Sequence, residues 1–470
     1  MKSVKSVLGC LLAATGFSVV SQATLITTET DVPLDGEYPV DVPADTTNVW
    51  TGCFSGEGAL RKTGLGLLVL ANPNNVFTGG IAIDAGPLRA DAEGALGTEK
   101  ITITQGATPR GCLQFNAQDA VFPNDIDVVG TYNKDYRACS TFKNVTLTGN
   151  VTSTGGLAVE NYPVNGTGGG TREVNFQSTT WNGTITAKGE LIIRTYGTNV
   201  FNAAVSATGA VSFGTVASTM GHVFLNSADN SFSSFSTYQP KIYCGAANVL
   251  SGAYWSISAK SSRQKGWHSL HMNGYDQTLN YLKNAATAGA SESCQIRSDK
   301  PCVLTLTGGS SSTQTTGHIL CGKVSLVVDA TKPTFVQCFG ELNGTVTTHT
   351  TDGTMTVKKG GVQITGLKTT FENMPQIDVE ASGSLAIDTE GQVAFPAVTT
   401  LNVAGKLEFG ASAGKPFTDQ LASLALDGGA SGLDFYDRYL SDAVNLLKPG
   451  GAVFFEIGEN QGEAVRQLMF

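Results

Sequence analysis

Short runs of alternating apolar and polar residues fill the chain from residue 24 to residue 420, and Gly, Asn and Asp separate them. The alternation is clearest in a series of apolar pairs whose members are two residues apart. A spacing of two puts both side chains on the same face of a strand. We therefore predict short strands with one buried face, marked by Ile377/Val379, Leu385/Ile387, Val393/Phe395, Leu401/Val403 and Leu407/Phe409.

These pairs recur every eight residues, with a last step of six, and turns such as Ser382-Gly383 and Ala404-Gly405 separate them. Gly suits such corners because it adopts turn conformations at little steric cost. Three strands of this length make a coil of about 20–24 residues, within the range of solenoid repeats. The pattern predicts an all-β fold over residues 24–423, a right-handed parallel β-helix with stacked apolar pairs, and similar alternation recurs at Ile185, Leu191, Ile193, Val211 and Phe213.

Composition agrees with an exported β-rich body. Of 470 residues, 56 are Gly, more than the usual share of about 7%, and only 15% are charged. The net charge of −9 argues against nucleic-acid binding, which requires a basic surface. The cysteines after Cys10 and the five histidines show no zinc-ligand spacing. Buried thiols or scattered disulfides remain the two interpretations for Cys53, Cys112, Cys139, Cys244, Cys294, Cys302, Cys321 and Cys338.

The N-terminus has the features of a secretory signal peptide at residues 1–23. Lys2 and Lys5 precede an apolar stretch from residue 7 to residue 20, and small residues lead up to Ala23. Cleavage is expected between Ala23 and Thr24. The apolar stretch is shorter than the roughly 20 residues of a membrane-spanning helix, and no later segment has that length.

A more specific pattern lies at residues 57–90. A Lys-Thr-Gly segment precedes an apolar strand; an aromatic residue followed by Thr-Gly-Gly comes next, and a second strand ends in Gly-Pro-Leu. This segment resembles the autotransporter-associated β-strand repeat, also called the passenger-associated transport repeat, although Pro87 stands where that family has Thr. The matching residues are Lys62, Thr63, Gly64, Phe77, Thr78, Gly79, Gly80, Gly86 and Leu88.

This resemblance implies a parallel β-helix of the kind found in bacterial surface proteins. The expected localisation is secreted or at the cell surface, through the Sec pathway, with outer-membrane association as one variant. The expected partners are the export machinery and an extracellular glycan or a host or matrix surface. The resemblance implies no cofactor, no metal and no particular ligand.

The last 47 residues differ from the rest of the chain. Spacing predicts a helix over residues 434–447, a stop at Lys448-Pro449-Gly450-Gly451, an apolar strand over 452–457 and a helix over 459–469. This order is typical of an α/β sheet. The segments Leu424-Ala425-Leu426-Asp427-Gly428-Gly429, Leu447-Lys448-Pro449-Gly450-Gly451 and Glu456-Ile457-Gly458 resemble the C-terminal part of release-factor glutamine methyltransferases.

That family acts with S-adenosylmethionine, and its Gly-rich cofactor loop and Asn-Pro-Pro-Tyr motif are absent from this sequence. We therefore expect residues 424–470 to be a truncated, inactive methyltransferase fragment, and we assign no catalytic or cofactor-binding residue to it. The junction is expected near residues 424–430, through a chimeric gene or an assembly error.

Parallel β-helices also include glycan-active enzymes, in which paired acids carry the chemistry. If a strand carries them, Asp125 and Asp127 would share one of its faces, as acid/base pairs do. Solvent-facing or turn positions are the alternative, and we favour it. Trp267, His268 and His271 form an aromatic–histidine cluster in a polar insertion, where ordinary packing is favoured over ligand contact. A non-enzymatic structural or adhesive solenoid is the leading interpretation; a methyltransferase and a glycan-active β-helix are the alternatives.

Overall fold

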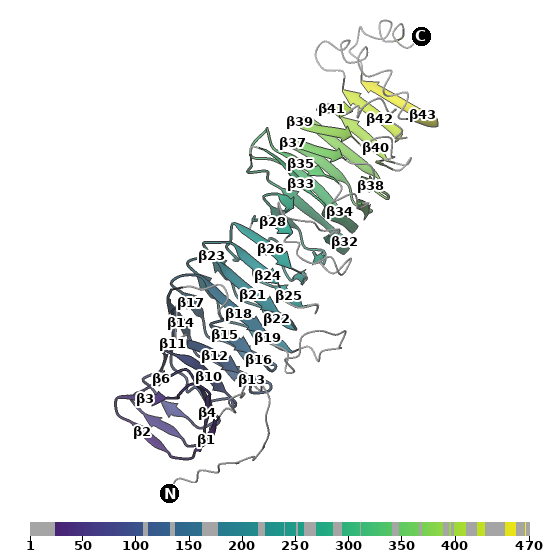
Figure 1. The fold of residues 1–470 in the computed structure, drawn as a ribbon. Helices are drawn as coiled ribbons and strands as arrows, with labels where there is room; N and C mark the ends of the chain where they lie inside the picture. Colours follow the sequence, from purple (N-terminus) through teal and green to yellow (C-terminus); the bar gives the residue numbers. More distant parts are fainter. Residues whose placement is uncertain are drawn as a thin grey trace, which may run out of the picture. The chain divides into compact units, whose positions relative to one another are not determined.

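The structure is a computed structural model (Figure 1). It describes residues 24–106, 111–131, 137–161, 177–214, 221–238, 240–250, 252–257, 269–284, 294–310, 312–340, 347–365, 369–388, 394–395, 399–409, 421–427, 447–456 and 466. Its contacts divide the chain into two compact units, residues 1–168 with 172–203 and residues 169–171 with 204–470.

Unit 1 is a parallel β-solenoid in which strands one coil apart pair with each other (Figure 1). Its first sheet has the order β1 (Thr24–Thr28), β4 (Thr46–Trp50), β7 (Leu67–Leu70), β10 (Gly86–Ala90), β12 (Gly111–Phe115), β15 (Cys139–Thr141), β18 (Leu157–Asn161), β21 (Leu191–Thr195). The second has the order β3 (Glu37–Asp41), β6 (Ala59–Thr63), β9 (Ile81–Ile83), β11 (Ile101–Gln105), β14 (Ile126–Gly130), β17 (Val151–Ser153), β20 (Ile185–Ala187).

Two smaller groups of strands complete the coils of unit 1. One contains β2 (Val32–Leu34), β5 (Phe54–Gly56) and β8 (Val76–Phe77). The other contains β13 (Ala120–Phe122), β16 (Val145–Leu147), β19 (Ser178–Trp181) and β22 (Thr198–Phe201).

Unit 2 is also a parallel β-solenoid. It begins with β23 (Val205–Ala207), and a short sheet has the order β24 (Val211–Gly214), β26 (Ser234–Tyr238), β28 (Tyr254–Ile257), β31 (Leu282–Asn284). The other strands follow one another in a long sheet: β25 (His222–Leu225), β27 (Lys241–Cys244), β29 (Ser269–His271), β30 (Gln277–Leu279), β32 (Gln295–Leu306), β33 (Thr313–Thr316), β34 (Ile319–Asp329), β35 (Val336–Phe339), β36 (Thr347–Thr351), β37 (Met355–Thr365), β38 (Thr369–Phe371), β39 (Gln376–Asp388), β40 (Thr400–Val403), β41 (Lys406–Phe409), β42 (Leu421–Asp427) and β43 (Leu447–Glu456).

The predicted coil length is confirmed by the register near the C-terminal end of unit 2. Met355 pairs with Ile377, and Ile377 pairs in turn with Leu401, so each step along the chain equals one predicted coil. The predicted inward pairs are buried as well: Ile377, Val379, Leu385, Ile387, Leu401, Val403 and Leu407 are each at most 3% exposed. Val393 lies outside the described residues. The all-β parallel solenoid predicted from the alternation is therefore confirmed.

The core of each coil is a column of like residues in register. In unit 1, Leu68 pairs with Leu88 and Leu88 with Leu113, and all three side chains are fully buried. The same strands alternate between buried and half-exposed positions, so the outer face keeps the polar residues. Stacking thus buries apolar surface continuously from one coil to the next, which is the main favourable term in folding.

Two details differ from the sequence prediction. Ser382-Gly383 does not separate two strands; it lies within β39, at an irregularity in the pairing between β37 and β39. A Cβ atom at Gly383 would lie 2.1 Å from the backbone oxygen of Val357. The neighbouring coil is therefore too close for a side chain, and a bend within one strand replaces the predicted turn.

The tail also departs from its prediction. Lys448-Pro449-Gly450-Gly451, predicted as a stop, lies inside β43, while the predicted apolar strand is confirmed from Ala452 to Glu456. β43 pairs in parallel with β42, and β42 pairs in parallel with β40. The predicted junction at residue 424 thus falls within a strand of the solenoid sheet. Residues 434–446 of the first predicted helix lie outside the described residues, and its last residue, Leu447, begins strand β43. Of the second predicted helix, at 459–469, only Arg466 is described, and it is helical.

Within the described ranges, we find no helix with the length and apolar character required to cross a membrane.

Replacing Ile103 with Ala should lower the free energy of unfolding by about 2–5 kcal/mol, because a fully buried rung of the core column leaves a cavity. Its neighbour Thr102 lies half-exposed on the outer face of the same strand. Thr102→Ala is the matched control and should change the free energy of unfolding by no more than about 0.5 kcal/mol. Urea denaturation followed by circular dichroism measures both; equal losses would contradict the assigned faces.

Candidate functional site

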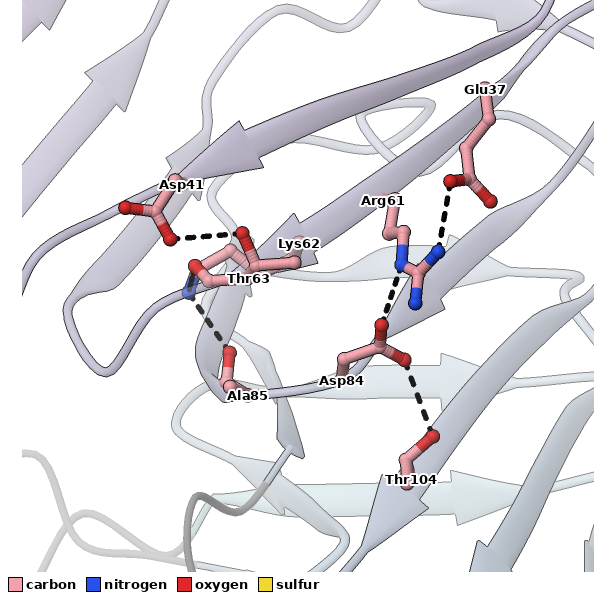
Figure 2. Close-up of polar contacts among 8 residues, drawn as sticks. All are labelled: Glu37, Asp41, Arg61, Lys62, Thr63, Asp84, Ala85 and Thr104. Carbon is pink, nitrogen blue, oxygen red and sulfur yellow. Dashed lines mark hydrogen bonds and ion pairs between the residues drawn. The ribbon is translucent and has the colours of Figure 1, made fainter.

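The Lys-Thr-Gly segment of the repeat signature forms one corner of the solenoid, and Figure 2 shows Lys62 and Thr63 there. Strand β6 alternates, and Lys62 points inward together with Leu60, with a side chain that is 0% exposed. In the core column it stands between Val40 and Ile83. Its Nζ donates hydrogen bonds to the backbone oxygens of Thr63 (2.7 Å), Gly64 (2.8 Å) and Ala85 (2.9 Å).

Burial lowers the pKa of Lys62 from 10.5 to about 8, and the carboxylate of Asp41 opposes this shift. Among the described residues, the ammonium group makes no ion pair with a carboxylate. Its partners are backbone oxygens of its own corner and of the next coil. Lys62 therefore joins two coils by satisfying carbonyl groups that the corner removes from the strand ladder.

The other two residues of the Lys-Thr-Gly segment complete this corner. Thr63 donates a hydrogen bond to Asp41 of the preceding coil, over 2.9 Å, as Figure 2 shows. Gly64 has a φ of 71°, and a Cβ atom there would lie 2.3 Å from the backbone oxygen of Val42. A left-handed conformation and close contact between coils both exclude a side chain at this position.

The aromatic–Thr-Gly-Gly part of the signature forms a second corner. Phe77 is 1% exposed and packs edge-on against Phe54 of the preceding coil, with ring centroids 6.4 Å apart. Thr78 and Gly79 donate backbone hydrogen bonds to Gly56 and Gly58 of the preceding coil. The remaining signature residues have the same structural character: the backbone oxygen of Gly80 accepts from Leu60, Gly86 begins β10, and Leu88 is fully buried.

A polar network lies on the outer face beside this corner (Figure 2). Arg61 bridges two carboxylates, Glu37 at 2.9 Å on one side and Asp84 at 2.6 Å on the other. Asp84 also accepts a hydrogen bond from Thr104 at 3.4 Å. These four residues come from four successive coils. Because Arg61 pairs with both Glu37 and Asp84, the three residues form a surface ion-pair network, and the two carboxylates are not a free acid/base pair.

The candidate pair Asp125 and Asp127 shares the outer face, on either side of the buried Ile126. Each acid has a structural partner. Asp125 accepts a hydrogen bond from the backbone nitrogen of Asn150 at 2.7 Å, and Asp127 forms an ion pair with Lys100 at 2.9 Å. This geometry favours the turn and solvent-facing interpretation of the pair.

The aromatic–histidine cluster is only partly visible. Trp267 and His268 lie outside the described residues, whereas His271 belongs to strand β29 and not to an inserted loop. Its ring stacks on that of Tyr243 in the adjacent strand, with centroids 4.4 Å apart. His271 also shares a hydrogen bond of 2.9 Å between its Nε2 and Ser269 Oγ.

Of the two interpretations of the cysteines, thiols or disulfides, the structure agrees with thiols. All eight that the structure describes are free thiols, and five of them are buried. Burial raises the pKa of the Cys294 thiol well above its usual value of 9.0, so this sulfur stays protonated at neutral pH. Within the described ranges, no group of three His, Cys, Asp or Glu side chains could hold a metal ion.

Sequence reasoning missed two of these features. It assigned Lys62 to a signature without placing it in the core, although the alternation with Leu60 indicates an inward position. It also missed the stacking of Tyr243 and His271, which lie one full coil apart along the chain. No local signal joins two such residues, because only the coil length brings them together.

Comparison with known proteins gives similarity over short stretches. The chain is 44% identical over 64 residues to the adhesin BmaC autotransporter of Brucella suis biovar 1, which is 14% of this chain and 2% of that protein. It is 56% identical over 45 residues to the release factor glutamine methyltransferase of Moorella thermoacetica, and 49% identical over 45 residues to that of Bacillus cereus. Each of these two matches covers 10% of this chain and 16% of the methyltransferase.

The chain thus spans only a small part of each relative that it matches. No protein-family model matches the sequence, and no solved structure matches it. The similarity to a surface adhesin and the similarity to a methyltransferase are therefore both local.

Replacing Lys62 with Met should lower the free energy of unfolding by about 1–3 kcal/mol at pH 7, because three backbone oxygens lose their donor. Lys100→Met is the control; Lys100 is exposed and paired with Asp127, so its loss should change stability little. Chemical denaturation of both variants measures the difference.

The lowered pKa of Lys62 also predicts how the free energy of unfolding depends on pH. Between pH 8 and 10.5 the unfolded state binds the Lys62 proton more tightly than the folded state, so this group raises the free energy of unfolding as the pH rises. Lys62→Met lacks this contribution, and the stability gap between the wild-type protein and the variant should widen across that range. A gap that narrows above pH 8 would show that the carbonyl oxygens hold Lys62 charged in the folded state.

Proposed function

We propose that this chain is an exported β-solenoid of the bacterial surface or medium, with a structural or adhesive role and no catalytic activity of its own. The stacked parallel coils carry this proposal, since every residue of the repeat signature at 62–88 serves a corner or the core. The local similarity to an adhesin autotransporter supports it.

Export is supported by the signal-peptide pattern of residues 1–23. Thr24, the residue after the expected cleavage site, lies in β1, and its backbone nitrogen donates to the Asp45 oxygen at 2.8 Å. Removal of residues 1–23 would leave this strand and its bond in place.

The methyltransferase alternative rests on the similarity of a 45-residue stretch. The sequence lacks the Gly-rich loop and the Asn-Pro-Pro-Tyr motif, so no residues are present to hold the cofactor or the substrate amide. β43, within the tail, extends the solenoid sheet through β42. We propose that the tail contributes a strand to this sheet rather than a cofactor site.

The mature protein should begin at Thr24 and should be accessible at the cell surface or in the medium. N-terminal sequencing by mass spectrometry and protease treatment of intact cells test this in the native host. Deletion of residues 7–20 is the control and should retain the protein inside the cell with an uncleaved N-terminus. A wild-type chain found inside the cell with Met1 would contradict the proposal.

The tail should bind no S-adenosylmethionine, which isothermal titration calorimetry of the full-length protein tests directly; measurable binding would overturn its inactive assignment.

Peptide mapping of the native protein tests whether the tail and the body belong to one chain. The tryptic peptide Leu407–Arg438 spans the junction, since trypsin does not cut Lys415-Pro416. Its detection would show a true fusion; body peptides without it would assign the tail to another gene.

A further inference from the structure

The outer face of unit 2 carries a column of rings that neither the core nor the repeat signature requires. Phe224 of β25, Tyr243 of β27 and His271 of β29 occupy one register. The Phe224 and Tyr243 ring centroids are 4.5 Å apart at an angle of 10°, and those of Tyr243 and His271 are 4.4 Å apart at 25°. Arg297 of β32 takes the next position in that register. We call these four residues the outer ladder.

Alternation in each strand fixes the outward direction of the ladder. The residues that precede its members, Val223, Ile242, Leu270 and Ile296, are at most 1% exposed and point into the core. Phe224, Tyr243 and His271 are half-exposed, and Arg297 is exposed. A second column runs beside the ladder in the adjacent register: His222, Lys241, Ser269 and Gln295.

The charge of this face differs from that of the outer face of unit 1. There, Arg61, Arg89 and Lys100 each form an ion pair with a carboxylate. Within the described ranges, neither Lys241 nor Arg297 forms one. The two cations lie two strand spacings apart and one outward position apart along the strands, roughly 12 Å between backbones, in a chain whose net charge is −9.

The histidines contribute no charge at neutral pH. Burial, followed by the charges of Arg297 and Lys241, lowers the pKa of His271 to about 4, while Asp299 opposes the shift. Burial and Lys241 also lower the pKa of His222. At pH 7 the face therefore presents neutral rings and two fixed cations, beside the exposed carboxylate of Asp299.

The orientation of the rings, like the two cations, gives the outer ladder a preference for anionic groups. The Tyr243 ring stacks face to face between those of Phe224 and His271, so both of its faces are covered and its half-exposed ring presents an edge. The edge of an aromatic ring is the positive part of its quadrupole, whereas a neutral sugar stacks on a ring face. Exposed edges and two unpaired cations both favour anionic groups.

From this arrangement we propose that the outer ladder binds an anionic polysaccharide, a linear chain carrying carboxylate or sulfate groups, laid across β25, β27, β29 and β32. Lys241 and Arg297 would pair with two anionic groups along the chain, and the half-exposed Gln295 could hydrogen-bond sugar hydroxyls. Nucleic acid is disfavoured because its bases stack on open aromatic faces, whereas both faces of Tyr243 are covered by its neighbours. This inference rests on the proposed function in one respect: the chain must be exported to meet an extracellular polysaccharide.

Affinity electrophoresis of the full-length protein in gels containing polygalacturonate, dextran sulfate or neutral dextran tests this proposal. Retardation is expected with the two polyanions, not with dextran, and should weaken with added salt. The double variant Lys241→Gln/Arg297→Gln should weaken binding at least tenfold. Lys283→Gln is the matched control, because Lys283 is exposed on β31 of the other sheet of unit 2.

Circular dichroism should show that both variants keep the wild-type fold. No retardation by either polyanion, equal retardation by dextran, or an equal loss in the Lys283 variant would overturn the proposal. Its failure is distinct from failure of the proposed function. An exported chain that binds no polyanion refutes the ladder alone, and an intracellular chain that binds through Lys241 and Arg297 refutes the surface role alone.

Discussion

In-register stacking of inward side chains between successive coils is the constraint on which this structure depends. A coil on its own is too thin to bury a core, so each rung gains its burial from the rungs of the neighbouring coils. This explains why Leu68, Leu88 and Leu113 align in one column. At Gly64 the neighbouring backbone leaves no room for a Cβ atom. The same constraint explains why a lysine can occupy a core position, since the long side chain of Lys62 reaches the carbonyl groups of two successive coils.

The sequence predicted the part of the fold that depends on local alternation. Alternation places pairs such as Leu385/Ile387 and Leu401/Val403 in the core, and their burial agrees. The bend at Gly383 was not predictable, because the neighbouring coil and not the local sequence decides whether a Gly makes a turn or a bulge. In the tail, the Pro-Gly-Gly of residues 449–451 suggested a stop, yet pairing with β42 includes these residues in a strand.

The candidate sites show a related limit. Asp125 and Asp127 were correctly placed on one face, but their partners Asn150 and Lys100 come from other coils. The outer ladder was hidden for the same reason. Its members come from successive coils of unequal length, and the step from Phe224 to Tyr243 is much shorter than the steps that follow it. With coil lengths that vary this much, a sequence alone does not reveal which outward residues become neighbours.

The register of unit 2 has a consequence for how such a chain is assembled. The pairing of Met355 with Ile377, and then of Ile377 with Leu401, closes two loops of nearly equal length. The entropy lost in closing a loop grows only slowly with its length, and each of these coils closes a loop of its own length rather than one that spans the whole chain. Lengthening the protein therefore adds no distant contacts. Each coil can order on the edge of the one before it, so the chain can fold from one end to the other without waiting for its far end.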